Sequence, residues 1–117
     1  MADRWIYMVF SNPAPGKEAE FNTWYDEVHV PEVIAVDGMV SAQRLALCET
    51  ESGKASGDLS PTTHRYGLLY ELNRHPDEVM AEVQARVADG RIRMDDCLDL
   101  TSVQMTWWTP QGDQQFH

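Results

Sequence analysis

The sequence predicts an α+β domain with the ferredoxin-like order βαββαβ. Four segments have the alternating or β-branched and aromatic composition of strands; they are residues 4–11, 39–47, 64–72 and 101–109. Two segments with apolar side chains at helical spacing, residues 17–30 and 76–89, each lie between two of these strands. This order produces a four-stranded antiparallel sheet with both helices on one face.

Size and composition indicate a single domain over residues 1–117. Of the 117 residues, 43% are apolar, which is enough for one core but not for two. Cys48 and Cys97 lack CxxC spacing. We therefore expect two reduced core thiols rather than a disulfide or a zinc site.

The charge excludes several classes of partner. Nineteen acidic and nine basic residues give a formal net charge of −10, which repels phosphate backbones and anionic lipids. We therefore expect no nucleic-acid and no membrane partner. No apolar run approaches the roughly 20 residues of a membrane span, and the N-terminal MADRW does not resemble a signal peptide, so a cytoplasmic protein is expected.

The first strand is apolar on both faces. Ile6, Met8 and Phe10 alternate with Trp5, Tyr7 and Val9. The helices cover one face only, so the other face needs a second cover. We predict that a second copy of the sheet covers it, which makes the protein a homodimer.

The stretch 20–42 joins a helix to the second strand without a linker. Phe21, Trp24, Tyr25 and Val28 have the spacing of an amphipathic helix. Pro31 disfavours helical geometry at the preceding residue, so we predict a kink there, a short new helix over 31–36, and a turn at residues 37–38.

The segment 49–63 is polar and rich in Ser, Gly and Thr. It is longer than ordinary hairpin loops, which leaves two interpretations open: a functional flap or lid, or plain disorder. Further along, Pro76 begins the second helix, residues 91–100 form an acidic connector, and Pro110 ends the last strand.

His29 is the candidate acid/base residue. It follows Tyr25 by four positions and Asp26 by three, so on an α-helix it shares a flank with the tyrosine and can donate an orienting hydrogen bond to the aspartate. A neutral imidazole at the Pro31 break can move a proton near neutral pH. The alternative is that His29 caps the helix end or pairs with a buried carbonyl.

Other aromatic side chains are candidates for the wall of a pocket between sheet and helix. Phenols at Tyr7, Tyr25, Tyr66 or Tyr70 can polarise a carbonyl or hold an enolate, and Tyr66 is favoured because it lies on the central third strand. Each tyrosine is also ordinary core material. Trp24 offers a flat apolar wall, although core packing explains most of the tryptophans equally well.

Arg44 is the one charged residue of the second strand. It neutralises a substrate carboxylate or enolate, or forms a salt bridge with Glu32 or Glu71. No metal site is predicted, because Pro31 interrupts the His29 and Glu32 pair and the other histidines lack ligand spacing. Phosphate-binding loops and nucleophile motifs are absent.

Two neighbouring motifs resemble the EthD-like families of the dimeric α+β barrel superfamily. Residues 24–33 read WYDEVHVPEV, matching the WY-x-x-x-H-x-P pattern of those families, and residues 36–44 read VDGMVSAQR, matching a turn followed by S-A-x-R. Asp37-Gly38 replaces the usual Pro-Gly and keeps the turn. The motifs cover about a quarter of the chain or less, and the element order covers nearly all of it.

The resemblance implies a dimeric α+β barrel that binds small aromatic or polyketide-derived ligands in a cleft between sheet and helices, with no cofactor. It makes His29 the acid/base residue and puts Trp24, Tyr25 and Tyr66 in the pocket wall, Tyr66 by topology rather than by motif. Combined with the residue patterns above, this predicts His29 and Tyr66 as catalytic residues, with Asp26 orienting the histidine. The predicted substrate-binding residues are Trp24, Tyr25, Tyr7 and Arg44.

Three functions stay open on this basis. The first is a cofactor-free lyase, cyclase or isomerase that acts on an aromatic or carbonyl-containing substrate. The second is a monooxygenase, either cofactor-independent or haem-using, although no basic patch is visible for haem propionates. The third is a non-catalytic ligand-binding or stress-associated dimer.

Overall fold

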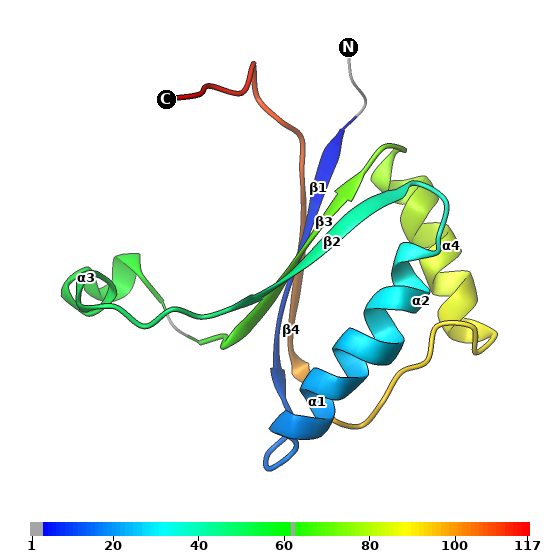
Figure 1. Ribbon diagram of the computed structural model, residues 1–117, viewed down its shortest axis with the longest axis horizontal. Coiled ribbons are helices and arrows are strands. Elements are labelled where there is room, and N and C mark those ends of the chain that lie inside the picture. Colours follow the sequence, from blue (N-terminus) through cyan, green and yellow to red (C-terminus); the bar gives the residue numbers. More distant parts are fainter. Residues whose placement is uncertain (1–3, 62) are drawn as a thin grey trace.

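A computed structural model describes residues 4–61 and 63–117. Its four strands form one sheet in the order β2-β3-β1-β4, and the three neighbouring pairs are antiparallel. The strands are β1 (Trp5–Pro13), β2 (Met39–Ala46), β3 (Tyr66–Leu72) and β4 (Leu98–Trp108). The helices α1, α2 and α4 cover one face of this sheet (Figure 1). The predicted α+β ferredoxin-like fold is confirmed.

The helix layer has two parts. The first is a continuous helical stretch made of α1 (Glu18–Trp24), a π-helical segment (Tyr25–His29) and α2 (Val30–Ile34). The second is α4 (Pro76–Ala88), which starts at Pro76 as predicted. The Nδ1 atom of His75 caps α4 by accepting a hydrogen bond from the Asp77 backbone N–H at 3.1 Å.

The predicted short helix at Pro31 is present as α2, with Pro31 in its first turn, but it follows a π-helical segment directly. Val30 is helical, with φ −60° and ψ −47°, and its N–H bonds to the Tyr25 carbonyl five residues earlier. Proline has no N–H to donate, and the wider π-helical turn shifts the hydrogen-bond ladder by one residue just before it. The chain therefore continues into α2 without ending the helix.

The turn before β2 depends on Gly38. Its φ of 98° lies in the left-handed region, and a Cβ at this position would come within 2.7 Å of Val79 Cγ2. The Gly38 carbonyl accepts a hydrogen bond from the Asn73 N–H at 3.0 Å. This position therefore joins the start of β2 to the end of β3 and lets α4 approach closely.

The last strand starts earlier than predicted. β4 begins at Leu98, which is buried and pairs with Pro13. A bulge between Phe10 and Asn12 of β1 accommodates extra residues of β4 before regular pairing resumes at Gln104. The acidic residues around Leu98 had suggested a solvated connector.

The core lies between the sheet and the helices. Its fully buried members come from almost every element and include Phe21, Val36, Tyr70, Val79 and Cys97. Cys48 is exposed, contrary to the expectation of two core thiols, because it follows the end of β2, where the chain leaves the body of the protein.

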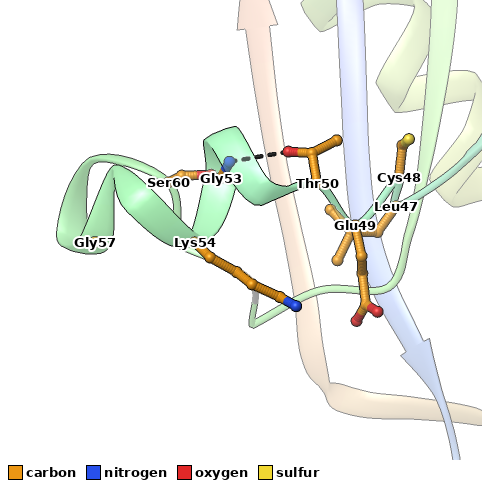
Figure 2. A pocket seen from close by; sticks show the side chains of 8 residues that line it. All are labelled: Leu47, Cys48, Glu49, Thr50, Gly53, Lys54, Gly57 and Ser60. Atoms are coloured by element: carbon orange, nitrogen blue, oxygen red, sulfur yellow. Dashed lines mark hydrogen bonds between the residues drawn. The ribbon is translucent and has the colours of Figure 1, made fainter.

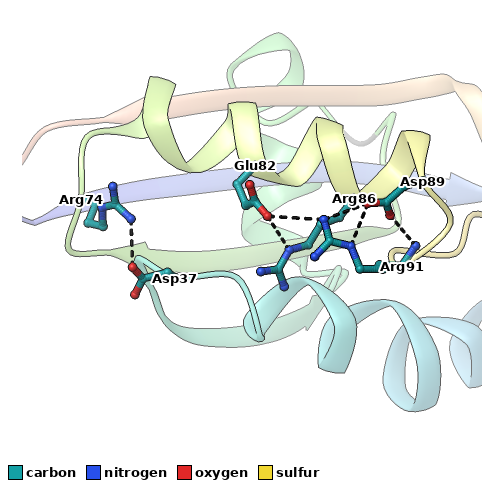
Figure 3. A network of polar contacts seen from close by, with 6 residues as sticks. All are labelled: Asp37, Arg74, Glu82, Arg86, Asp89 and Arg91. Atoms are coloured by element: carbon teal, nitrogen blue, oxygen red, sulfur yellow. Dashed lines mark hydrogen bonds and ion pairs between the residues drawn. The ribbon is translucent and has the colours of Figure 1, made fainter.

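Ion pairs run along the outer surface of α4 (Figure 3). Arg74 pairs with Asp37 at 2.9 Å, which links the start of α4 to the turn before β2. Near the other end, Glu82 pairs with Arg86 at 2.9 Å and with Arg91 at 3.7 Å. Such exposed pairs contribute little stability.

The polar segment 49–63 contains local helix, within its described residues. α3 (Glu51–Ala55) is followed by a 3-10 turn at Gly57–Leu59. Thr50 Oγ1 caps α3 by accepting a hydrogen bond from the Gly53 N–H at 2.9 Å (Figure 2). The segment lies apart from α1, α2 and α4 (Figure 1), and none of its described residues lines the cavity between the sheet and these helices.

The face of the sheet without helices is partly apolar. Ile6, Met8 and Phe10 are half-buried there, whereas Leu45 and Trp108 are 40% and 58% exposed. No helix in the described part of the chain has the length and apolar character needed to cross a membrane. Dimerisation stays a prediction.

Candidate functional site

A cavity of about 460 Å³ lies between the sheet and the helices. β1, β3 and β4 supply its floor; the π-helical segment, α2, α4 and the connector before β4 supply the rest. None of the residues that line it is Asp, Glu, Lys or Arg. The cavity therefore suits an uncharged, largely apolar molecule.

Three of the predicted site residues meet at this cavity: Tyr7 from β1, and Tyr25 and His29 from the π-helical segment. Trp24, Arg44, Tyr66 and Asp26 do not line it. The predicted pocket between sheet and helix therefore exists, but only part of the predicted residue set faces it.

The ring of His29 is held between two aromatic rings. It stacks on Trp24, with centroids 4.5 Å apart and planes at 28°, and meets the edge of Tyr25 at 5.5 Å. The Trp24 indole N–H donates a hydrogen bond to the Arg93 carbonyl at 3.0 Å, which fixes the stacked ring. Trp24 is thus a support for His29 from behind rather than a cavity wall.

His29 is electrically neutral near neutral pH. Burial lowers its pKa from 6.5 to about 4, and the Arg93 backbone and the Glu32 charge oppose this shift only in part. Its Nδ1 atom is buried and has no hydrogen-bond partner among the described residues. The Arg93 backbone carbonyl lies near the His29 ring and raises its pKa, which is what the alternative interpretation of His29 as the partner of a buried carbonyl requires.

Asp26 does not orient His29. The carboxylate is bonded to Arg44, with Arg44 Nη1 donating to Asp26 Oδ1 at 3.1 Å. The expected contact assumed α-helical geometry, in which residues three apart share a face. The wider π-helical turn instead brings residue 29 next to residue 24, five positions earlier.

Arg44 lies behind the cavity wall. Its guanidinium carbon is 5.0 Å from the centre of the Tyr25 ring and 5.5 Å from that of Tyr66. It pairs with Asp26 rather than with Glu32 or Glu71, the partners considered from the sequence. Arg44 therefore supports the Tyr25 ring and does not reach a ligand in the cavity.

Tyr66 also lies outside the cavity. Its hydroxyl donates a hydrogen bond to Glu18 Oε2 at 2.5 Å, at the start of α1. Strand alternation correctly placed this side chain on the helix-covered face. However, Tyr66 is the first residue of β3, so it meets the end of the helix layer instead of its middle.

The phenols that face the cavity are Tyr7, Tyr25 and Tyr70. Burial raises the pKa of each above its ordinary value, so all three stay protonated and can act as hydrogen-bond donors. The Tyr25 hydroxyl is 3.2 Å from Ser11 Oγ. Tyr70 takes the position in β3 that the sequence interpretation had given to Tyr66.

Several wall residues carried no signal in the sequence. Met80, Val83 and Gln84 come from α4, and Val103 and Met105 from β4. The apolar face of α4 was visible in the sequence, but nothing marked it as facing a cavity rather than the core. No group of three His, Cys, Asp or Glu side chains suited to a metal ion occurs in the described ranges.

Comparisons with known proteins bear on the fold. No protein-family model and no curated protein sequence matches the chain. Among solved structures it is similar to an EthD family protein from Bacillus halodurans, with a TM-score of 0.57 at 12% identity over 92% of this chain and 98% of that one. This chain has the same fold.

Two enzymes share that fold. SnoaB, a cofactor-independent oxygenase from Streptomyces nogalater, matches with a TM-score of 0.61 at 11% identity over 96% of this chain and 97% of that one. A monooxygenase from the gene ActVA-Orf6 of Streptomyces coelicolor, in complex with the ligand Nanaomycin D, matches with a TM-score of 0.51 at 11% identity over 99% and 94%. At such identities the similarity supports the ferredoxin-like α+β fold alone.

Proposed function

We propose that the cavity binds a neutral aromatic or carbonyl-containing small molecule and that His29 removes a proton from it without a cofactor. The observation that carries this proposal is a neutral imidazole in a cavity whose lining has no charged side chain. A buried nitrogen without a partner costs about 1–3 kcal/mol. Such a cost is typical of a residue that serves a function rather than stability.

The proposed base is the Nε2 atom of His29, because Nδ1 is closed off within the protein. The imidazolium that forms is poorly solvated, which is what lowers the pKa. It is therefore favoured only when the substrate anion stays beside it as an ion pair. The reaction class is proton removal next to a carbonyl, which serves lyase, cyclase or isomerase chemistry.

The tyrosines supply the complementary role. A phenol that stays protonated donates a hydrogen bond to the oxygen on which negative charge develops. Tyr25 and Tyr70 are both protonated and both line the cavity. We assign this role to them in place of Tyr66, whose hydroxyl is bonded to Glu18.

Proton removal can be tested without the natural substrate. We expect the protein to exchange the α-protons of 2-tetralone, a neutral aromatic ketone, for deuterium in D2O, followed by proton NMR. His29→Gln should lower the catalysed rate by about 100-fold or more. The matched control is His117→Gln in the exposed C-terminal segment, which should exchange at the wild-type rate. Equal rates for the wild type and His29→Gln would refute the role of His29.

A cofactor-independent oxygenase is the second candidate, favoured by the similarity to SnoaB. The same proton removal from a phenolic substrate leaves an electron-rich anion that O2 can oxidise. Oxygen uptake with anthrone as the probe, lost in His29→Gln, would select this function over the first. Haem does not fit the cavity, because none of its lining residues is a cation that could bind the propionates.

We also propose that two copies pair through the helix-free face of the sheet. The support is the exposed apolar side chains there, Leu45 and Trp108 among them. Sedimentation velocity at micromolar concentration should give a dimer. A monodisperse monomer would contradict this pairing. It would not distinguish between the two enzymatic functions.

A further inference from the structure

A second hollow, called here the outer groove, lies beside the cavity. It measures about 410 Å³ and runs between the beginning of α4 and the adjoining ends of β1 and β4. Its aromatic lining comes from Trp5, His75 and Trp107, and Trp108 borders it at the end of β4 with its side chain on the helix-free face. The indole of Trp107 is 41% exposed although it is large and apolar, so this hollow offers aromatic surface to a ligand.

The outer groove and the cavity share a wall. Met80 and Gln84 from α4 and Met105 from β4 line both hollows. Methionine has three rotatable bonds and no branching, so a wall with two methionines can rearrange around a ligand at small cost. The Tyr7 hydroxyl donates a hydrogen bond to Met105 Sδ at 3.2 Å, which links this wall to the cavity floor.

An aromatic ladder crosses the wall. Tyr7, in the cavity, stacks on Trp107 of the outer groove with centroids 5.1 Å apart and planes at 2°. On its other side Tyr7 stacks on Tyr70 at 5.3 Å. The three stacked rings form one continuous aromatic row across the sheet that runs from the cavity into the outer groove.

We infer that the cavity and the outer groove form one two-compartment site for an elongated, uncharged ligand. A ring with a hydroxyl or carbonyl group occupies the cavity, and an apolar chain or second ring system extends along the ladder into the outer groove. The inference rests on the proposed function, because it assumes that the cavity binds the reacting part of the substrate.

The charges around the outer groove define the ligand further. Asp77 is the one charged residue that lines it, and its side chain is 96% exposed. With a net charge of −10 on the whole chain, a carboxylate or phosphate at the outer end is repelled. The chain that extends outward is therefore apolar along its length.

The test compares two neutral probes, 4-propylphenol and 4-heptylphenol, by isothermal titration calorimetry. The longer alkyl chain reaches the outer groove, and we expect it to bind the wild type at least about tenfold more tightly. Trp5→Ala removes a ring that lines the outer groove but not the cavity, and should reduce this gain to threefold or less. Trp107→Ala, which also removes a ring that lines the outer groove but not the cavity and is 41% exposed, repeats the test if Trp5→Ala fails to fold.

The control is Phe116→Ala, which removes an exposed aromatic ring from the C-terminal segment and should keep the full gain. If 4-propylphenol binds but the gain survives in both tryptophan variants, the two-compartment site is wrong and the proposed function stands. If neither phenol binds the wild type, the proposed function fails and this inference fails with it.

Discussion

The rings of Trp24 and His29 stack face to face at 4.5 Å, although four residues separate them in the chain. An ordinary α-helix points residues five apart in different directions, and the π-helical turn brings them onto one face. The same turn leaves Asp26 near Arg44 instead of His29. One irregular turn therefore determines what surrounds the candidate base.

Removing the stacked indole should raise the pKa of His29. In Trp24→Ala the imidazole gains access to water, so its pKa should move from about 4 toward the ordinary 6.5. The loss of a buried indole should also destabilise the fold by about 3–5 kcal/mol. An NMR titration of the His29 ring protons measures the shift, and a value unchanged from the wild type would show that Trp24 does not control it. Trp108→Ala serves as the control with no effect on this pKa.

The depressed pKa of His29 should make stability depend on pH. The native state holds His29 neutral down to about pH 4, whereas the unfolded chain protonates near 6.5. Between these values the unfolded state binds more protons, so stability falls as the pH drops from 6.5 to 4, by about 3 kcal/mol in total. Urea unfolding at pH 7 and pH 4.5 should show this loss in the wild type.

The variant His29→Phe isolates the contribution of His29 to the pH dependence of stability. It keeps an apolar ring in place, removes the unpaired nitrogen and does not titrate. Carboxylates whose pKa values are lowered by groups other than His29, such as Asp89 and Asp95, contribute to both proteins alike. The variant should therefore lose less stability on acidification than the wild type. Parallel pH profiles would mean that His29 is not the residue responsible.

The fold followed from the sequence because its signals are local. Strand alternation, the proline at the start of α4 and the glycine turn at Gly38 each act over a few residues. The sequence motif also singled out His29, and Tyr7 was among the candidate phenols; both line the cavity.

The wrong predictions concern the direction of side chains on the first helix and the position of residues along the strands. Side-chain directions were taken from an α-helix, so the π-helical turn misplaced Asp26. The position of a residue along its strand was not known, so Tyr66 was preferred to Tyr70, which lies four residues further along β3 and reaches the cavity. The walls from α4 and β4 come together only through the tertiary fold, and no short motif encodes them.

The pH profile of catalysis by His29 should fall on the acid side near the pKa of His29. A base must be unprotonated, so kcat/KM for the exchange of 2-tetralone should rise with pH up to about 4 and stay level from about 5 to 8. A limb near 6.5 would mean that the base is an exposed histidine. The rise should be absent from the residual activity of His29→Gln.

Arg44 should act through Tyr25. Its guanidinium covers the Tyr25 ring at 5.0 Å and is held by Asp26. Arg44→Met keeps an apolar stem but removes the charge, so we expect a loss of about 1–2 kcal/mol in unfolding free energy. Arg74→Met, an exposed residue in ion pairs with Asp37 and Glu78, should cost less. Equal losses of unfolding free energy in the two variants would show that the contact between Arg44 and the Tyr25 ring does not stabilise the fold.

Filling the cavity should separate binding from folding. Val83 lies on α4 and lines the cavity, so the larger ring of Val83→Phe occupies space that a ligand needs. Because the ring enters a hollow of about 460 Å³ rather than packed core, the thermal midpoint should hold or rise, whereas core overpacking typically costs about 1–3 kcal/mol. The affinity for 4-propylphenol, measured by calorimetry, should fall at least tenfold, about 1.4 kcal/mol.

The control is Ala85→Phe, which adds the same ring at an exposed position of the same helix, outside the cavity. It should bind 4-propylphenol as the wild type does. If Val83→Phe binds 4-propylphenol as tightly as the wild type does, the phenol binds outside this cavity. The proposed role of His29 as the base would then be wrong as well.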